Sequence, residues 1–216
     1  MHQKNIIIPK TARYFILGDI TDTIEQVWFV CHGYAQLANY FIKNFEVLND
    51  GKTLIVAPEG LNRFYWKGFS DRVVASWMTK EDRECDIHDY VNFLNCVYDD
   101  VISSLKNKKV RVNVLGFSQG TATVCRWLAN NKVKVDNLIL WAGAFPEDMN
   151  FEADKVVFDA MKIVAVIGNQ DEFLTEEAIA MQLLFLNKHK ISIDLIRFQG
   201  KHEINKEALI QLQKYF

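Results

Sequence analysis

A short segment, Val114–Ala122 (VLGFSQGTA), has the residue types and spacing of a strained turn that exposes a nucleophile. Ser118 lies between Gly116 and Gly120 in the pattern G-x-S-x-G, where an apolar run gives way to helix-forming residues. Glycines at these positions allow close backbone packing, so the turn can present the hydroxyl at a helix N-terminus, where developing negative charge is favoured. We predict that Ser118 is a nucleophile; the alternative is a tight turn that contains a serine by coincidence.

A serine hydroxyl is a weak nucleophile, so it needs a base and a carboxylate that orients the base. Of the five histidines, His202 follows the last expected strand, in the loop RFQGKHEI, and is our candidate base. Asp171 follows another expected strand, in IVAVIGNQDEFL, and is our candidate carboxylate because such acid-bearing turns commonly read G-x-x-D. Glu172, the next residue, is the competing carboxylate, and a surface loop histidine is the alternative interpretation of His202.

The negative charge of a tetrahedral intermediate needs hydrogen-bond donors. One is expected to be the backbone N–H of Gln119, directly after the nucleophile, and the other the N–H of Tyr34 in the loop CHGYAQ. Gly33 allows that loop to turn toward the site, while His32 is expected to hold the loop in place rather than to take part in the reaction.

The expected elements explain how distant residues could meet. Short apolar runs indicate buried strands, and apolar residues three and four apart indicate helices. Strands are predicted at Asn5–Ile8, Tyr14–Leu17, Gln26–Cys31, Thr53–Ala57, Val110–Leu115, Asn137–Trp141, Lys162–Ile167 and Ile191–Phe198. Helices are predicted at Leu37–Leu48, Ile87–Leu105, Gln119–Asn130, after an N-cap at Thr175, and at Glu203–Tyr215, with a loop around Pro146. This alternation predicts an α/β fold, a mostly parallel sheet with helices on both faces, whose strand ends share one edge.

One long segment, residues 60–84, has poor periodicity and many aromatic residues, and is predicted to be an irregular excursion on the substrate side. Tyr65, Trp66, Trp77 and Met78 are candidate substrate-binding residues, because apolar walls with few polar groups suit an acyl chain. The alternative is that these side chains fill the core beneath a long loop.

With these residues placed, the chain resembles the α/β-hydrolase superfamily, and within it the phospholipase/carboxylesterase group that includes acyl-protein thioesterase-like serine esterases. The likeness covers nearly the whole chain and rests on HG, AP, SW, GFSQG, GNQDEF and GKHE, in that order, beginning at His32, Ala57, Ser76, Gly116, Gly168 and Gly200. The resemblance implies the same Ser118–Asp171–His202 triad and the same two amides. The loop HGYAQ departs from the glycine-richer HGxG common in the group, with Ala35 as the stiffer residue.

The composition excludes several other classes of protein. The 216 residues carry a net charge of −2, without the basic patch that nucleic acid requires, and no segment approaches a membrane span. No metal-ligand spacing or cofactor motif is present, and four isolated cysteines favour a reducing compartment, so a cytoplasmic protein is expected. A single domain over residues 1–216 is the economical interpretation, and the oligomeric state stays open.

These patterns predict an enzyme that hydrolyses carboxylic esters of short to medium acyl length, a small-molecule substrate class, through an acyl-enzyme and without a cofactor. A long-chain acyl thioesterase or lysophospholipase is a second interpretation, which a deep apolar channel would favour. A non-catalytic binding module on a hydrolase scaffold is a third, because fold alone does not prove activity.

Overall fold

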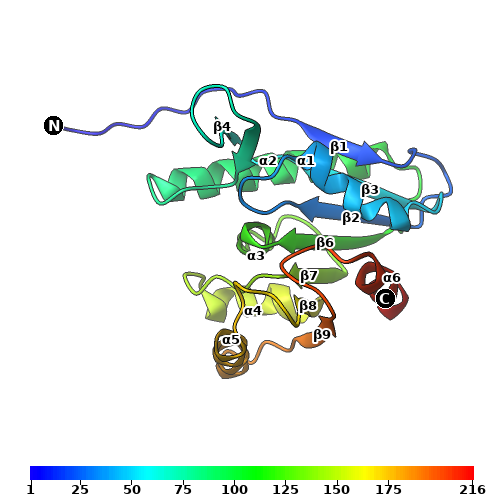
Figure 1. The fold of residues 1–216 in the computed structure, drawn as a ribbon. Coiled ribbons are helices and arrows are strands. Elements are labelled where there is room, and N and C mark those ends of the chain that lie inside the picture. Colours follow the sequence, from blue (N-terminus) through cyan, green and yellow to red (C-terminus); the bar gives the residue numbers. More distant parts are fainter.

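The computed structural model describes residues 1–216, and its centre is a seven-stranded sheet (Figure 1). The strand order is β1-β3-β2-β6-β7-β8-β9; β1 pairs antiparallel with β3, and all the other pairs are parallel. The strands are β1 (Tyr14–Leu17), β2 (Gln26–Cys31), β3 (Thr53–Pro58), β6 (Arg111–Phe117), β7 (Asn137–Trp141), β8 (Lys162–Gly168) and β9 (Asp194–Phe198). The five inner strands are apolar and almost completely buried, as expected for parallel strands covered on both faces.

Helices cover both faces of the sheet, which gives the doubly wound α/β arrangement of the α/β-hydrolase fold (Figure 1). The helices are α1 (Ala38–Phe41), the 3₁₀ helix η1 (Ile42–Leu48), α2 (Arg83–Ser104), α3 (Gln119–Ala129), α4 (Phe151–Asp159), α5 (Glu176–Lys188) and α6 (Lys206–Tyr215). Helices α2 to α5 contribute buried residues to one core cluster, and α1, η1 and α6 to the cluster on the opposite face. None of these helices is both long and apolar enough to cross a membrane.

Two predictions near the N-terminus were wrong. Asn5–Ile8 forms no strand, because it has no neighbouring strand to pair with, and its isoleucines are largely exposed. The single helix predicted over Leu37–Leu48 is divided into α1 and the tighter η1, although the predicted apolar stripe is buried through Phe41, Phe45 and Leu48.

Three elements were not predicted, namely α4 and the two strands of a hairpin. The loop predicted around Pro146 contains α4, which begins after Asn150; the Asn150 side chain accepts a hydrogen bond from the Ala153 N–H at 3.2 Å. The irregular excursion over residues 60–84 contains an antiparallel hairpin, β4 (Asn62–Tyr65) and β5 (Val73–Ser76). The predicted N-cap at Thr175 is confirmed, since its hydroxyl accepts from the Ala178 N–H at 3.2 Å.

Candidate active site

The turn between β6 and α3 holds Ser118 in a strained backbone conformation, with φ 53° and ψ −116°. Glycine is required on both sides. A Cβ on Gly116 would lie 2.3 Å from the carbonyl oxygen of Gly120, and one on Gly120 would lie 2.3 Å from that of Cys31. Strain of this kind costs about 1–3 kcal/mol and persists where the surroundings enforce it, as at the sharp turns that carry nucleophiles.

The loops after β8 and β9 bring a carboxylate and an imidazole together. His202 Nδ1–H donates to Asp171 Oδ2 at 2.8 Å, and the Asp171 side chain is completely buried. The other oxygen, Oδ1, accepts from the backbone N–H groups of Phe173 at 2.9 Å and Leu174 at 3.3 Å. These donors hold the carboxylate in a fixed position, and Glu172, which is exposed, makes no such contact.

The imidazole lies beside the nucleophile turn. Its ring packs on Phe117, the residue before Ser118, with centroids 5.0 Å apart, and against Phe173 at 4.7 Å. The second ring nitrogen, Nε2, has no partner in the protein, and neither has the Ser118 hydroxyl. Nε2 is therefore the atom free to accept the serine proton, a contact that commonly tightens only when a substrate is bound.

Two backbone N–H groups near Ser118 have no hydrogen-bond partner in the protein, namely those of Tyr34 and Gln119. The loop that carries Tyr34 passes close to Ser118, since a Cβ on Gly33 would lie 3.2 Å from the Ser118 Cβ. The loop turns at Ala35, whose φ of 59° is in the left-handed region. Unpartnered amides beside a nucleophile are the arrangement that stabilises an oxyanion.

His32 holds the loop that carries Tyr34 in place through hydrogen bonds. It is fully buried, its Nδ1–H donates to the Gly33 carbonyl at 2.7 Å, and its Nε2 accepts from the Gly60 N–H at 2.9 Å. Trp77 stacks on the imidazole with centroids 5.0 Å apart and donates its indole N–H to the His32 carbonyl at 2.8 Å. Burial lowers the pKa of His32 to about 4, so the ring is neutral near pH 7.

The structure separates the four predicted substrate-binding residues. Tyr65 and Trp66 are exposed on the β4–β5 hairpin, and the Trp66 ring lies 6.0 Å from that of Tyr34, so Trp66 is beside the candidate site. Trp77 is fully buried and has no surface left for a substrate, which corrects that prediction; it supports His32 instead. Met78 is half-buried and its carbonyl accepts from the Gln119 side chain at 3.0 Å.

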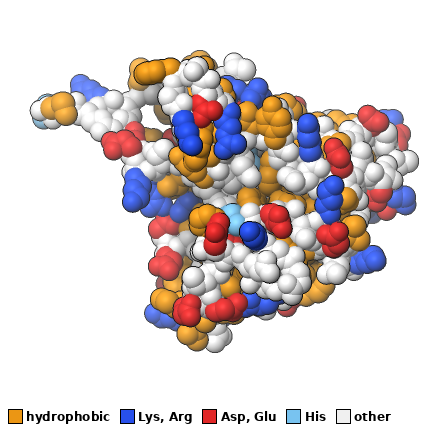
Figure 2. Space-filling view, viewed as in Figure 1, with side chains coloured by type: hydrophobic (Ala, Val, Ile, Leu, Met, Phe, Trp, Pro, Cys, Tyr) orange, Lys and Arg blue, Asp and Glu red, His pale blue; other side chains and the backbone are white.

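Figure 2 shows a histidine near the centre of one face, with hydrophobic and acidic side chains around it and a basic side chain beside it. Hydrophobic and basic side chains also lie together in the upper part of this view, over the hairpin. The described residues contain no group of three or more His, Cys, Asp or Glu side chains that could hold a metal ion.

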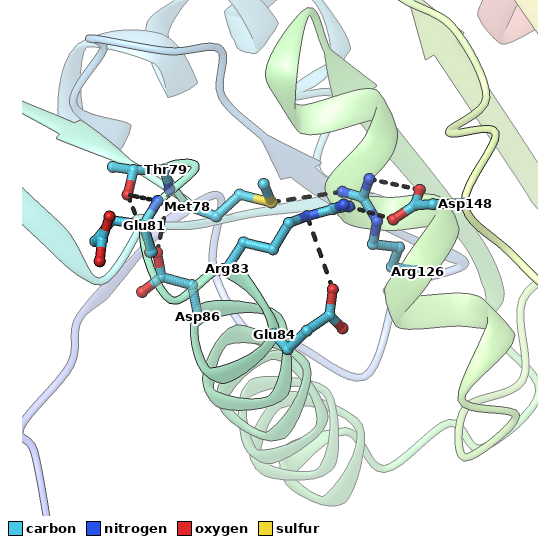
Figure 3. A network of polar contacts seen from close by, with 8 residues as sticks. All are labelled: Met78, Thr79, Glu81, Arg83, Glu84, Asp86, Arg126 and Asp148. Atoms are coloured by element: carbon cyan, nitrogen blue, oxygen red, sulfur yellow. Dashed lines mark hydrogen bonds and ion pairs between the residues drawn. The ribbon is translucent and has the colours of Figure 1, made fainter. Parts of the chain in front are cut away.

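An ionic cluster that was not predicted holds the β7–α4 loop, residues 142–150. Arg83 of α2 and Arg126 of α3 both form ion pairs with Asp148, as Figure 3 shows, and the Arg126 contact measures 2.9 Å. The same loop places Gly143 against Ser118, because a Cβ there would lie 2.7 Å from the Ser118 carbonyl oxygen. The three charged residues are far apart in sequence, so only the fold brings them together.

The fold and this edge of the sheet define an α/β-hydrolase of the serine-esterase type. Residues 29–213 match the sequence model of the family described as "Serine hydrolase (FSH1)", and the chain belongs to that family. No curated protein matches the chain by sequence.

Solved structures show the same fold at low identity. Esterase PE8 is 17% identical with a TM-score of 0.70, over 95% of this chain and 98% of that one. Acyl-protein thioesterase 2 of Zea mays is 13% identical with a TM-score of 0.71, over 95% of this chain and 97% of that one. A phospholipase/carboxylesterase of Dyadobacter fermentans is 15% identical with a TM-score of 0.68, over 97% of this chain and 98% of that one.

Proposed function

We propose that this serine hydrolase cleaves carboxylic esters with short to medium acyl chains, and that Ser118, His202 and Asp171 are its catalytic triad. The observation that carries the proposal is the 2.8 Å hydrogen bond between His202 and the buried Asp171, beside the strained turn of Ser118. A buried carboxylate that orients an imidazole next to a serine hydroxyl is the arrangement that activates serine.

In the acylation half of the reaction, Ser118 Oγ attacks the ester carbonyl carbon while His202 Nε2 takes its proton. Asp171 keeps the imidazole in the required tautomer and stabilises the imidazolium that forms. The carbonyl oxygen becomes an oxyanion that accepts from the free N–H groups of Tyr34 and Gln119. When the intermediate collapses, His202 returns the proton to the leaving alcohol, and the acyl group stays on Ser118.

In the second half, water replaces the alcohol. His202 takes a proton from the water molecule, whose oxygen attacks the acyl carbon, and the same two amides stabilise the second oxyanion. Collapse releases the carboxylic acid, and the proton goes back to Ser118. In both halves of the reaction His202 acts as the base in its neutral form.

The experiment that tests the triad is covalent labelling with a fluorophosphonate, followed by intact mass, alongside hydrolysis of p-nitrophenyl acetate. We expect one adduct on the wild-type protein and none on Ser118→Ala, with turnover lost in that variant. Circular dichroism and urea unfolding of Ser118→Ala provide the folding control. Labelling of a folded Ser118→Ala protein, or ester turnover by it, would refute the assignment of the nucleophile.

A further inference from the structure

A cavity of about 260 Å³ lies between helix α5 and the sheet, and we call it the α5 cavity. Strands β7, β8 and β9 form one wall through Leu140, Ala165 and Leu195, and α5 and the β7–α4 loop form the others. Of its 16 lining residues 13 are hydrophobic, and the remaining three are Gly143, Glu147 and Gln182. The cavity is therefore an apolar space with very few polar groups in its wall.

The cavity exists because small residues line the space beneath α5. The helix packs on the core through Ile179 and Leu186, which are buried, whereas Ala144, Ala165 and Ala178 leave the space between helix and sheet unfilled. The space is open to solvent at its rim, where Ala178 and Met181 of α5 and Leu195 of β9 are exposed. An apolar space of this size is thus expected to receive a ligand, and its volume is just below the usual range of about 300–1,000 Å³ for small-molecule sites.

The walls of the cavity are continuous with the candidate active site at two residues. Gly143 lies against the Ser118 carbonyl, where a Cβ would approach within 2.7 Å, and it also lines the cavity. Leu174 lines the cavity as well, and its N–H donates to Asp171 Oδ1 at 3.3 Å. The cavity therefore adjoins the turn of Ser118 and the loop of Asp171, on the side of the β7–α4 loop.

We propose that the α5 cavity binds the aliphatic chain of the ester substrate, an inference that rests on the proposed esterase function. The chain lies against Ala165 and Ala178, and the cavity's limited volume sets the preferred chain length. The chain also covers the Gln182 amide nitrogen, which is buried without a hydrogen-bond partner. Binding an unsubstituted chain leaves that donor unsatisfied, so replacing it with an apolar side chain should favour such substrates.

The test compares kcat/KM across two series, p-nitrophenyl esters from acetate to dodecanoate and alkyl acetates from ethyl to dodecyl. In the series whose chain enters the cavity, kcat/KM of the wild type should rise about fourfold per methylene until the cavity is full. Ala178→Phe places a ring at the cavity wall. It should lower the ratio of kcat/KM for the octyl ester to that for the ethyl ester, or for the octanoate to that for the acetate, at least tenfold. Ala180→Phe, an exposed position on the same helix that does not line the cavity, should leave the profile unchanged.

Gln182→Leu is the complementary variant, because it is expected to raise the same ratio several-fold, and misfolding does not produce such a gain. The inference is overturned if Ala178→Phe and Gln182→Leu both keep the wild-type profile in both series. If the wild type hydrolyses no ester at all, the proposed function fails instead. Calorimetric titration with sodium octanoate then tests separately whether the cavity binds an aliphatic chain. Binding to the wild type that is lost in Ala178→Phe supports the cavity as the binding site, and absence of binding to the wild type refutes it.

Discussion

The neighbouring carboxylates Asp171 and Glu172 lie in opposite environments although they are adjacent in sequence. Asp171 is buried, bonded to His202 and fixed by two backbone N–H groups, whereas Glu172 faces solvent. A carboxylate can orient an imidazole only where its oxygens are held, so the environment, not the residue type, decides which of the two can act.

Asp171→Asn is therefore expected to lower kcat by about 10³–10⁴-fold, because an amide selects the wrong imidazole tautomer. Glu172→Gln is the matched control and should stay within about twofold of the wild type, as expected for an exposed side chain without partners. Initial rates with p-nitrophenyl acetate measure both. A larger loss in Glu172→Gln than in Asp171→Asn would assign the role to the other carboxylate.

For His32 we predict an effect of pH on the free energy of unfolding. Its pKa is lowered from 6.5 to about 4 by burial, so the unfolded chain binds a proton in this window that the native protein does not. The free energy of unfolding should therefore fall as the pH drops below 6.5, by about 1.4 kcal/mol per pH unit and about 3 kcal/mol by pH 4. Above pH 6.5 the contribution is constant.

Urea unfolding of the wild type and His32→Gln at several values between pH 7 and pH 4 isolates this effect, since the other titrating groups are common to both proteins. We expect the stability difference between them to shrink as the pH falls. A difference that is independent of pH would contradict a buried neutral imidazole.

At the scale of elements, the β7–α4 loop connects the ionic cluster to the catalytic edge. Asp148 holds the loop on α2 and α3 (Figure 3). Gly143 in the same loop approaches Ser118 and lines the α5 cavity. Its position therefore depends on one carboxylate shared by two arginines, of which Arg126 is the more buried.

Asp148→Ala leaves Arg126 without its partner, and we expect a loss of about 1–3 kcal/mol in the free energy of unfolding. Glu84→Ala is the control, because the Glu84 side chain is 81% exposed and lies 3.8 Å from Arg83. This substitution should lower the free energy of unfolding by less than about 0.5 kcal/mol. Urea midpoints at equal m-values provide the measurement. Equal, small effects of both substitutions would show that the cluster does not hold the loop.

The accuracy of the sequence-based predictions also differs by element. Buried apolar runs such as QVWFVC and NLILW identified β2 and β7 within one residue, because strands covered on both faces have no competing polar pattern. The hairpin was missed since Arg63 and other polar residues interrupt its short strands, and only pairing defines it. The cap residue Asn150, with Glu152 after it, was a readable signal of α4 that the acidic composition of the segment concealed.

The same distinction applies to the candidate site. Residue types and strand ends predicted which residues meet at one edge of the sheet, as the contact between His202 and Asp171 illustrates. Burial was not predictable, so Trp77 was assigned to a substrate wall although it packs beneath His32. The α5 cavity and the ionic cluster depend on contacts between distant elements, for which a single sequence contains no local pattern.

At the scale of the whole molecule, the extended N-terminal segment stands apart from the packed layers (Figure 1). Ile6, Ile7 and Ile8 are 86%, 89% and 70% exposed, so they contribute little to the core. Contiguous exposed apolar side chains of this kind favour association between molecules.

Replacing all three isoleucines with serine should leave the free energy of unfolding within about 0.5 kcal/mol of the wild type, because exposed side chains contribute little. Any concentration-dependent association should weaken in the same variant. Urea unfolding and sedimentation velocity at several protein concentrations test the two parts. A loss of several kcal/mol would mean that the segment is packed in solution.

The strand order has a consequence for refolding. Ser118, Asp171 and His202 follow three different strands, and β9, which precedes His202, is the last strand in the chain and lies at an edge of the sheet. Parallel strands pair only after long intervening segments have closed, and such non-local pairing forms slowly. During refolding, the helical circular dichroism signal should thus return before ester hydrolysis. The delay between the two would measure how long the last strand takes to pair with the sheet.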